Sequence, residues 1–221
     1  MQAYSNGLSS QTDTSKDTWI EKPKIDCLTA ECLQLYEKAR AISDDKPIEV
    51  KLDSKQFNYK KDASIWVSKV DIKEFLCKEK LNVSLIQVFM RLLQNDHCGR
   101  NCIPEQFGWL CPSTIRADIR LTNGVEVEES IHQSVDKSIS TKKNFILAPC
   151  VEGGHWSLLV ICPKNNTVYQ FDSLAQDPPR PLQLKSYINS SLKKVMGTSP
   201  QWKAMKCAQQ PRGTICVATT C

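Results

Sequence analysis

The sequence predicts an α+β fold, in which helices in the first part of the chain precede a run of adjacent strands. Apolar residues recur at helical intervals within residues 27–42, 66–96 and 124–140. Between residues 144 and 174, three short runs rich in β-branched and aromatic residues are separated by the turn sequences Glu-Gly-Gly and Lys-Asn-Asn. Helices followed by a block of strands are typical of the α+β class.

Residues 1–63 are predicted to form a flexible leader with one short helix. Residues 1–24 are polar and show no periodic pattern. Residues 43–62 are rich in turn-forming residues, and we expect loops and turns there. The helix is expected between these segments, where apolar residues recur at helical spacing: Leu28, Cys32, Leu35, Ala39 and Ile42.

The compact domain is predicted to span residues 64–221 and to begin with helices. Residues 66–96 hold two helical segments separated at Leu81–Ser84, and Ser68 or Asp71 can cap the first. Residues 124–140 predict a further helix, on which His132 is interpreted as an ordinary surface or core residue. One face of the second helix is apolar and is expected to lie in the core: Leu85, Val88, Phe89 and Leu92.

The second half of the domain is predicted to hold three successive strands and a helix. The strands are expected within residues 144–151, 155–163 and 167–174. A proline-rich loop follows at Pro178, Pro179 and Pro181. The helix within residues 182–196 carries an apolar side: Leu184, Tyr187, Ile188 and Leu192.

Composition argues against several classes of protein. The net charge of +5 is mild and the basic residues are scattered, so no nucleic-acid partner is predicted. The sequence shows no secretory signal and no apolar run long enough to span a bilayer, so its eleven cysteines are expected to be reduced thiols. No metal or other cofactor is predicted, because the nearest zinc-ligand candidates contain no Cys-x-x-Cys pair: His97, Cys98, Cys102 and Cys111.

Two residues at the ends of neighbouring strands are candidates for chemistry. His155 opens the second predicted strand and Asp172 closes the third. In an antiparallel hairpin these positions lie side by side, so the carboxylate can accept a hydrogen bond from the imidazole. Such a bond fixes the ring tautomer and stabilises the charged imidazolium. Taken alone, the pair is equally compatible with a structural hydrogen bond.

A cysteine near the end of the sequence can complete a reactive site. Cysteine attacks as the thiolate, and a neighbouring histidine lowers the pKa of the thiol. A glutamine a few residues upstream can donate to a developing oxyanion. The last stretch supplies Gln209, Gln210 and Cys216 in that order. The alternative for Cys216, in a chain with eleven cysteines, is a small buried apolar residue.

In this order of residues the chain resembles the Ulp1/sentrin-type ubiquitin-like-protein-specific cysteine proteases. The likeness rests on Gly-His-Trp at residues 154–156, on Asp-Ser at 172–173, and on glutamine and cysteine near the end. It extends upstream to "LNVSLIQVFMRLL" and to "FGWLCPSTI", which is typical of plant members often carried by transposable elements. The resemblance covers residues 64–221 and implies a papain-like fold with a central antiparallel or mixed sheet.

The resemblance also implies roles for five residues. His155 would be the general base, Asp172 would orient it, and Cys216 would be the nucleophile. Gln210 would contribute to the oxyanion hole, and Trp156 would line the channel for the glycine tail of the substrate. The implied reaction is cleavage of a peptide or isopeptide bond after the C-terminal glycines of a ubiquitin-like modifier, of SUMO type, by a monomer in the nucleus or cytoplasm.

The sequence departs from the family pattern after Cys216. Family members place the cysteine at the start of a buried helix, in a pattern such as Cys-Gly-Tyr-Tyr-Val-Cys, whereas only residues 217–221 follow here. We therefore expect the C-terminal helices to be missing. One hypothesis is that a deleted base shifts the reading frame just before the family motif, which sequencing of the gene across residues 213–221 tests.

Two alternatives to an active protease follow. The chain could be a catalytically dead remnant that at most binds a ubiquitin-like protein. It could also be a small acyltransferase with a His-Asp/Glu-Cys site, which is disfavoured because no glycine-rich phosphate-binding loop is present.

Overall fold

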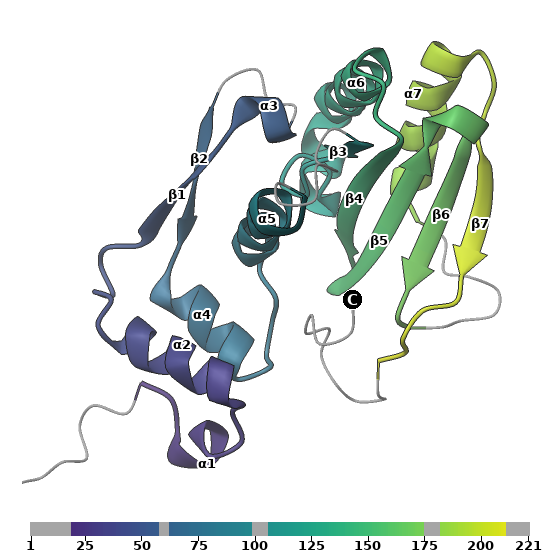
Figure 1. The fold of residues 1–221 in the computed structure, drawn as a ribbon. Coiled ribbons are helices and arrows are strands. Elements are labelled where there is room, and N and C mark those ends of the chain that lie inside the picture. Colours follow the sequence, from purple (N-terminus) through teal and green to yellow (C-terminus); the bar gives the residue numbers. More distant parts are fainter. Residues whose placement is uncertain (1–18, 58–61, 99–105, 175–181, 211–221) are drawn as a thin grey trace, which may run out of the picture.

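A five-stranded mixed sheet forms the centre of the computed structural model, which describes residues 19–57, 62–98, 106–174 and 182–210 (Figure 1). Helices α6 and α7 cover one face of this sheet. Helix α5 lies between this sheet and the remaining elements, which are a two-stranded hairpin and the N-terminal helices (Figure 1). The predicted α+β class and mixed sheet are confirmed.

The described helices and strands alternate in an irregular order along the chain. The helices are α1 (Lys22–Ile25), α2 (Ala30–Arg40), α3 (Ser54–Phe57), α4 (Lys69–Leu76), α5 (Val83–Leu92), the π-helical turn η1 (Leu93–Cys98), α6 (Ala117–Ser140), the short 3-10 turn η3 (Pro163–Asn165) and α7 (Leu184–Met196). The strands are β1 (Ile48–Leu52), β2 (Ala63–Val67), β3 (Phe107–Trp109), β4 (Phe145–Glu152), β5 (His155–Cys162), β6 (Thr167–Asp172) and β7 (Gln201–Met205). Within the described part of the chain, no helix has the length and apolar character needed to cross a membrane.

The large sheet has the order β3-β4-β5-β6-β7. Strands β4, β5 and β6 pair antiparallel, as the three predicted strands require, whereas β3 and β7 add in parallel at the two edges. Burial alternates along β4 and β5, because successive side chains point to opposite faces of a strand. The face toward α6 and α7 forms the main core: Val127, Ile131, Val135, Ile146, Ala148, Leu159, Ile161, Val168, Leu184, Ile188 and Leu192.

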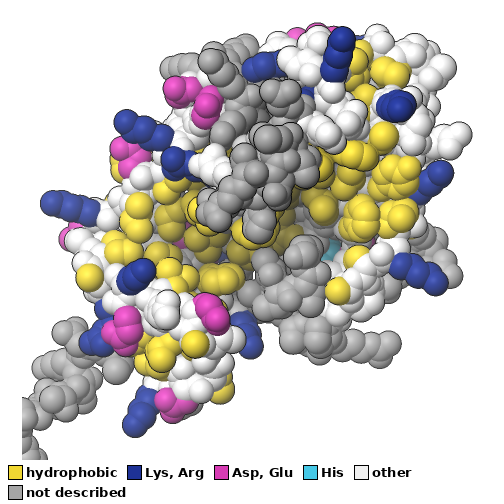
Figure 2. All heavy atoms as spheres, viewed as in Figure 1, with side chains coloured by type: hydrophobic (Ala, Val, Ile, Leu, Met, Phe, Trp, Pro, Cys, Tyr) yellow, Lys and Arg dark blue, Asp and Glu magenta, His cyan; other side chains and the backbone are white. Residues whose placement is uncertain are grey.

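The opposite face of the sheet is only partly covered. Leu158 and Val160 on β5, with Tyr169 and Phe171 on β6, are half-buried there. Figure 2 shows hydrophobic side chains gathered over these strands. The edge strand β7 was not predicted, because its sequence Gln-Trp-Lys-Ala-Met is mostly exposed and lacks a regular apolar alternation.

The prediction of loops and turns throughout residues 43–62 is wrong. Ile48–Leu52 is a strand that pairs with Ala63–Val67, so the hairpin crosses the predicted boundary at residue 64. Leu52 is fully buried, and it packs with Phe57, Met90 and Trp109. The apolar residues of β1 alternate with charged ones. Leu52 is buried against α5 and β3 and Val50 packs against the N-terminal cluster, whereas Ile48 is 42% exposed. The described residues 19–57 therefore pack against the rest of the chain.

The two predicted helices within residues 66–96 are confirmed, but only part of the predicted apolar face of the second is buried. Leu85 and Val88 are partly buried and pack against a core cluster, as predicted. Ser68 caps α4 through a capping box with Asp71. On α5 the buried side chains are Gln87 and Met90, whereas Phe89 and Leu92 are 48% and 51% exposed. The prediction that Phe89 and Leu92 lie in the core is therefore wrong.

Candidate active site

The structure brings His155 and Asp172 together as the strand order predicted. Asp172, the last residue of β6, lies opposite Ser157 on β5. His155 is two residues from Ser157 and so lies on the same face of the sheet, diagonally across from Asp172. The Nε2 atom of His155 is 2.7 Å from Oδ1 of Asp172.

The orientation of the Asp172 carboxylate is fixed by a second donor. The backbone N–H of Leu174 donates to the same oxygen, Oδ1, at 2.9 Å. A carboxylate that accepts from the amide two residues later is a local turn motif of aspartate. This second bond was not predicted, although the sequence Asp-Ser-Leu after a strand is compatible with it.

The other ring nitrogen of His155, Nδ1, does not bond the carboxylate. The His155 side chain is 5% exposed, and that of Asp172 is 16% exposed. Within the described residues, Nδ1 of His155 is buried and has no hydrogen-bond partner. With the Nε2 proton donated to the carboxylate, Nδ1 carries the lone pair and can accept a proton. This arrangement is that of a histidine base oriented by a carboxylate.

The buried carboxylate of Glu152 anchors the turn before His155, and the sequence analysis did not identify it. Gly153 and Gly154 connect β4 to β5 with φ angles of +57° and +77°, which favour glycine. Glu152, opposite His155 in the register, is 8% exposed. Its two carboxylate oxygens accept hydrogen bonds from the backbone N–H groups of residues 183 and 184, each at 3.1 Å. The N-terminus of α7 is thereby joined to the turn that carries His155.

The glutamines of the last stretch lie beside the end of β6. The backbone N–H of Gln210 donates to the carbonyl of Ser173 at 2.8 Å. Nε2 of Gln209 donates to the carbonyls of Cys207 at 2.9 Å and of Asp172 at 3.5 Å. The backbone of Gln210 therefore lies against Ser173, the residue that directly follows Asp172. Cys216 lies outside the described residues.

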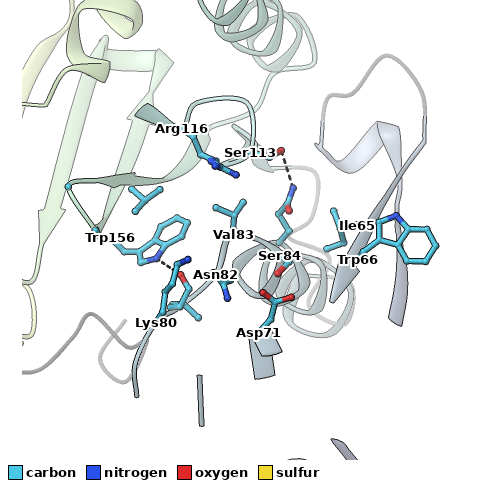
Figure 3. A pocket seen from close by; sticks show the side chains of 15 residues that line it. Ile65, Trp66, Asp71, Lys80, Asn82, Val83, Ser84, Ser113, Arg116 and Trp156 are labelled. Carbon is cyan, nitrogen blue, oxygen red and sulfur yellow. Dashed lines mark hydrogen bonds between the residues drawn. The ribbon is translucent and has the colours of Figure 1, made fainter. Parts of the chain in front are cut away.

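Trp156 faces a groove on the other side of the sheet. Its Nε1–H donates to the carbonyl of Leu81, in the connection between α4 and α5, at 2.8 Å. The groove has a volume of about 650 Å³ and lies between the N-terminal helices and the β4–β5 turn (Figure 3). Its walls include Ile65, Lys80, Val83, Arg116, Val151 and Trp156. Trp156 therefore lines a groove, and its role in a channel for the substrate tail stays a prediction.

Of the four residues considered for zinc, the structure describes the side chain of Cys111 alone. Cys102 lies outside the described residues, as do the side chains of His97 and Cys98. The Sγ atom of Cys111 lies 3.0 Å from both Gln87 Nε2 and Ser113 Oγ. In the portion described, no three histidine, cysteine or acidic side chains form a group that could hold a metal.

The chain was compared with known proteins. Residues 112–218 match the model of the Ulp1 protease family, C-terminal catalytic domain, a range that contains all five candidate residues. No curated protein is a significant match to the sequence.

Solved structures give the more extensive likeness. The C-terminal Ulp1 protease domain in complex with Smt3, the yeast ortholog of SUMO, matches with a TM-score of 0.52 and 19% identity, over 85% of this chain and 78% of that one. The catalytic domain of the Ulp1-like SUMO protease of Chaetomium thermophilum matches with a TM-score of 0.54 and 18% identity, over 84% and 73%. The chain therefore has the fold of the Ulp1 protease domain, and its residues 112–218 match that family's catalytic-domain model.

Proposed function

We propose that this protein is a cysteine-type peptidase of the Ulp1 family, which cleaves a peptide or isopeptide bond after the C-terminal glycines of a ubiquitin-like modifier. The observation that carries the proposal is the buried His155–Asp172 pair at 2.7 Å, with Nδ1 of His155 directed away from the carboxylate and able to accept a proton. The family match over residues 112–218 supports the assignment of this pair to a protease. The similar yeast domain was solved with Smt3, which supports a SUMO-type modifier as the partner.

The proposed mechanism follows from the chemistry of the pair. His155 takes the thiol proton of Cys216 through Nδ1, and the thiolate attacks the carbonyl carbon of the terminal glycine. Asp172 accepts the Nε2 proton of the ring in a hydrogen bond and stabilises the imidazolium that forms. The side-chain amide of Gln210 donates to the oxyanion of the tetrahedral intermediate. His155 then returns the proton to the leaving amine, and the C–N bond breaks to leave a thioester on Cys216. Water hydrolyses this thioester, which frees the thiol of Cys216 and the carboxylate of the modifier.

The substrate tail is proposed to enter along the groove beside Trp156. A tail that ends in two glycines has no side chains at its end, so it can pass through a passage too narrow for other sequences. Gly153 and Gly154 line the same groove directly before His155, which adds little side-chain volume at the point where the tail would reach the site.

An electrophilic probe tests the proposal. A SUMO protein whose C-terminal glycine is replaced by an α,β-unsaturated methyl ester (the vinyl-ester probe) should modify one cysteine by conjugate addition of the thiolate. Peptide mass spectrometry should locate the resulting thioether adduct on Cys216. His155→Ala should reduce the labelling rate at least a hundredfold, because the base is lost. His132→Ala, which replaces a half-buried histidine on α6, serves as the matched control and should label at the parent rate.

Two results would count against the proposal. Labelling that persists in His155→Ala would exclude the pair as the activating base. Binding of unmodified SUMO without any labelling of the parent protein would favour the alternative of a binding protein that lacks catalysis.

A further inference from the structure

Two buried polar atoms on strands β5 and β6 have no role in the site described so far: the hydroxyl oxygen of Ser157 and the side-chain nitrogen of Gln170. Ser157 is 6% exposed. Within the described residues, neither Ser157 Oγ nor Gln170 Nε2 has a hydrogen-bond partner. Burial of a polar group without a partner is costly, so such groups normally bond one another or a neighbouring polar side chain.

The strand register places both side chains next to the Asp172 carboxylate. Ser157 on β5 lies directly opposite Asp172 on β6, and Gln170 lies opposite Leu159. Side chains two residues apart on a strand point to the same face, so Ser157 shares the face of His155. Gln170 shares the face of Asp172 for the same reason. Ser157 is therefore the direct cross-strand neighbour of Asp172 and a diagonal neighbour of Gln170.

The Asp172 carboxylate has a second oxygen that a hydroxyl at this position can reach. Both described hydrogen bonds to the carboxylate, from His155 Nε2 and from the backbone N–H of Leu174, go to Oδ1. Directly opposed Cβ atoms in a sheet are about 4.5–5.5 Å apart, so rotation about the Cα–Cβ bond of Ser157 can direct Oγ toward Oδ2. A hydroxyl donates one hydrogen bond and accepts others, so Oγ can at the same time accept from Gln170 Nε2.

We propose that Ser157 is a positioning residue of the candidate site, whose hydroxyl donates to Oδ2 of Asp172 and accepts from the amide of Gln170. A donor at each oxygen holds the plane of the carboxylate. Oδ1 then stays aligned with Nε2 of His155 while the imidazole takes up and returns a proton. Hydrogen bonds to a charged acceptor are stronger than those between neutral groups, which favours this partner for the hydroxyl. The inference rests on the proposed function for the reaction that the pair serves, but not for the contact itself.

Labelling of Cys216 with the vinyl-ester probe measures the effect on the site. Ser157→Ala removes the donor to the carboxylate and should slow labelling roughly three- to tenfold, because the orienting carboxylate becomes freer to rotate. Ser157→Thr keeps a hydroxyl at the same position and should label close to the parent rate. A role of Ser157 in packing alone would not distinguish the two variants in this way.

Two further variants test the specificity of the effect. Gln170→Met keeps the length of the side chain and removes the donor to Ser157, so it should slow labelling by a smaller factor than Ser157→Ala does. Ser191→Ala is the matched control. Ser191 is also fully buried, and its hydroxyl has no partner among the described residues, but it lies on α7 rather than on the strands that carry the pair. This control should label at the parent rate.

Urea unfolding tests the contact between Ser157 and Asp172 without requiring catalysis. In the parent protein, Ser157→Ala should raise the equilibrium constant of unfolding roughly five- to twentyfold, because a hydrogen bond to a charged group is lost. In Asp172→Ala the acceptor is absent, so the same change should have little effect on the constant. A double-mutant cycle of the two replacements measures this coupling.

The outcomes separate this inference from the proposed function. Labelling of Ser157→Ala at the parent rate would overturn the inference, and so would equal slowing in Ser157→Ala and in folded Ser157→Thr. An equal change of the unfolding constant with and without the Asp172 carboxylate would overturn it as well, because Ser157 would then bond another group, such as a buried water. If the cycle shows coupling and the parent protein is never labelled, the contact stands and the proposed function fails.

Discussion

Replacement of Asp172 can separate the orientation of the His155 ring from the stability of the fold. Two donors converge on Oδ1, His155 Nε2 and the backbone N–H of Leu174, so an asparagine oxygen can accept both bonds in the same place. The neutral amide cannot stabilise an imidazolium as a carboxylate does. We therefore expect Asp172→Asn to keep the fold while it lowers the rate of Cys216 labelling by roughly 10²- to 10⁴-fold.

Labelling kinetics with the vinyl-ester probe and urea unfolding of the same sample would measure the two effects. Asp44→Asn, at an exposed carboxylate that pairs with Lys69, is a control that should change neither the labelling rate nor the fold. A labelling rate in Asp172→Asn within threefold of the parent would exclude Asp172 from the orientation of the base.

The hairpin that holds His155 depends on a helix far along the chain. Glu152 accepts the first backbone N–H groups of α7, and its position opposite His155 transmits that anchor to the Gly153–Gly154 turn. In Glu152→Gln the side-chain NH₂ would face one of these donors and leave it without an acceptor. We expect the free energy of unfolding to fall by about 1–3 kcal/mol. We also expect the labelling rate of the folded variant to fall several-fold, because the turn is released.

Glu128→Gln is the matched control for this prediction. Glu128 also bonds α7, through the hydroxyl of Ser190, and that bond lowers the pKa of the Glu128 carboxyl. In Glu128→Gln the amide oxygen can still accept from Ser190, but the ion pair with Lys194 is lost. Stability should therefore fall slightly, and the labelling of folded protein should not slow. If Glu152→Gln loses stability but labels at the parent rate, Glu152 serves the fold alone.

The elements differ in how far the sequence could predict them. The His155–Asp172 contact was predictable, because strands with short turns leave little freedom of register and both residues stand at strand ends. Strand β1 and the buried face of α5 were not predictable, because both depend on contacts with residues that are distant in the sequence. Gln87 is buried because its amide bonds Ser113 and Cys111 across the fold, and no local pattern reveals such partners.

The candidate site was predictable to the same extent. Its base and orienting carboxylate follow from local strand geometry, and Trp156 follows from its place next to His155. The anchor at Glu152 and the second donor to Asp172 depend on backbone amides, which every residue carries and which no side-chain pattern marks. The charged side chains of the groove belong to residues 71, 80 and 116, which the fold brings to one space from separate elements.

A hydrogen bond from an indole connects two walls of the groove, strand β5 and the connection between α4 and α5. Trp156 lies on β5, and its Nε1–H donates to the carbonyl of Leu81 between α4 and α5, 75 residues earlier. Leu81 is 7% exposed, so its carbonyl has little access to water if the donor is removed. The width of the groove therefore depends on this bond.

Trp156→Phe removes the donor and keeps an aromatic face in the groove. We expect the free energy of unfolding to fall by about 1–2 kcal/mol, because the Leu81 carbonyl loses its partner. The groove walls would separate more readily, so the affinity for a fluorescein-labelled heptapeptide ending in Gly-Gly should fall several-fold. Amide hydrogen exchange should quicken at residues 80–84. Trp202→Phe is the matched control: its Nε1–H donates to Asn189 Oδ1 at 2.8 Å, between β7 and α7 and away from the groove. That variant should lose comparable stability and retain peptide affinity. Equal losses of affinity in the two variants would mean that general stability, rather than the indole bond across the groove, controls tail binding.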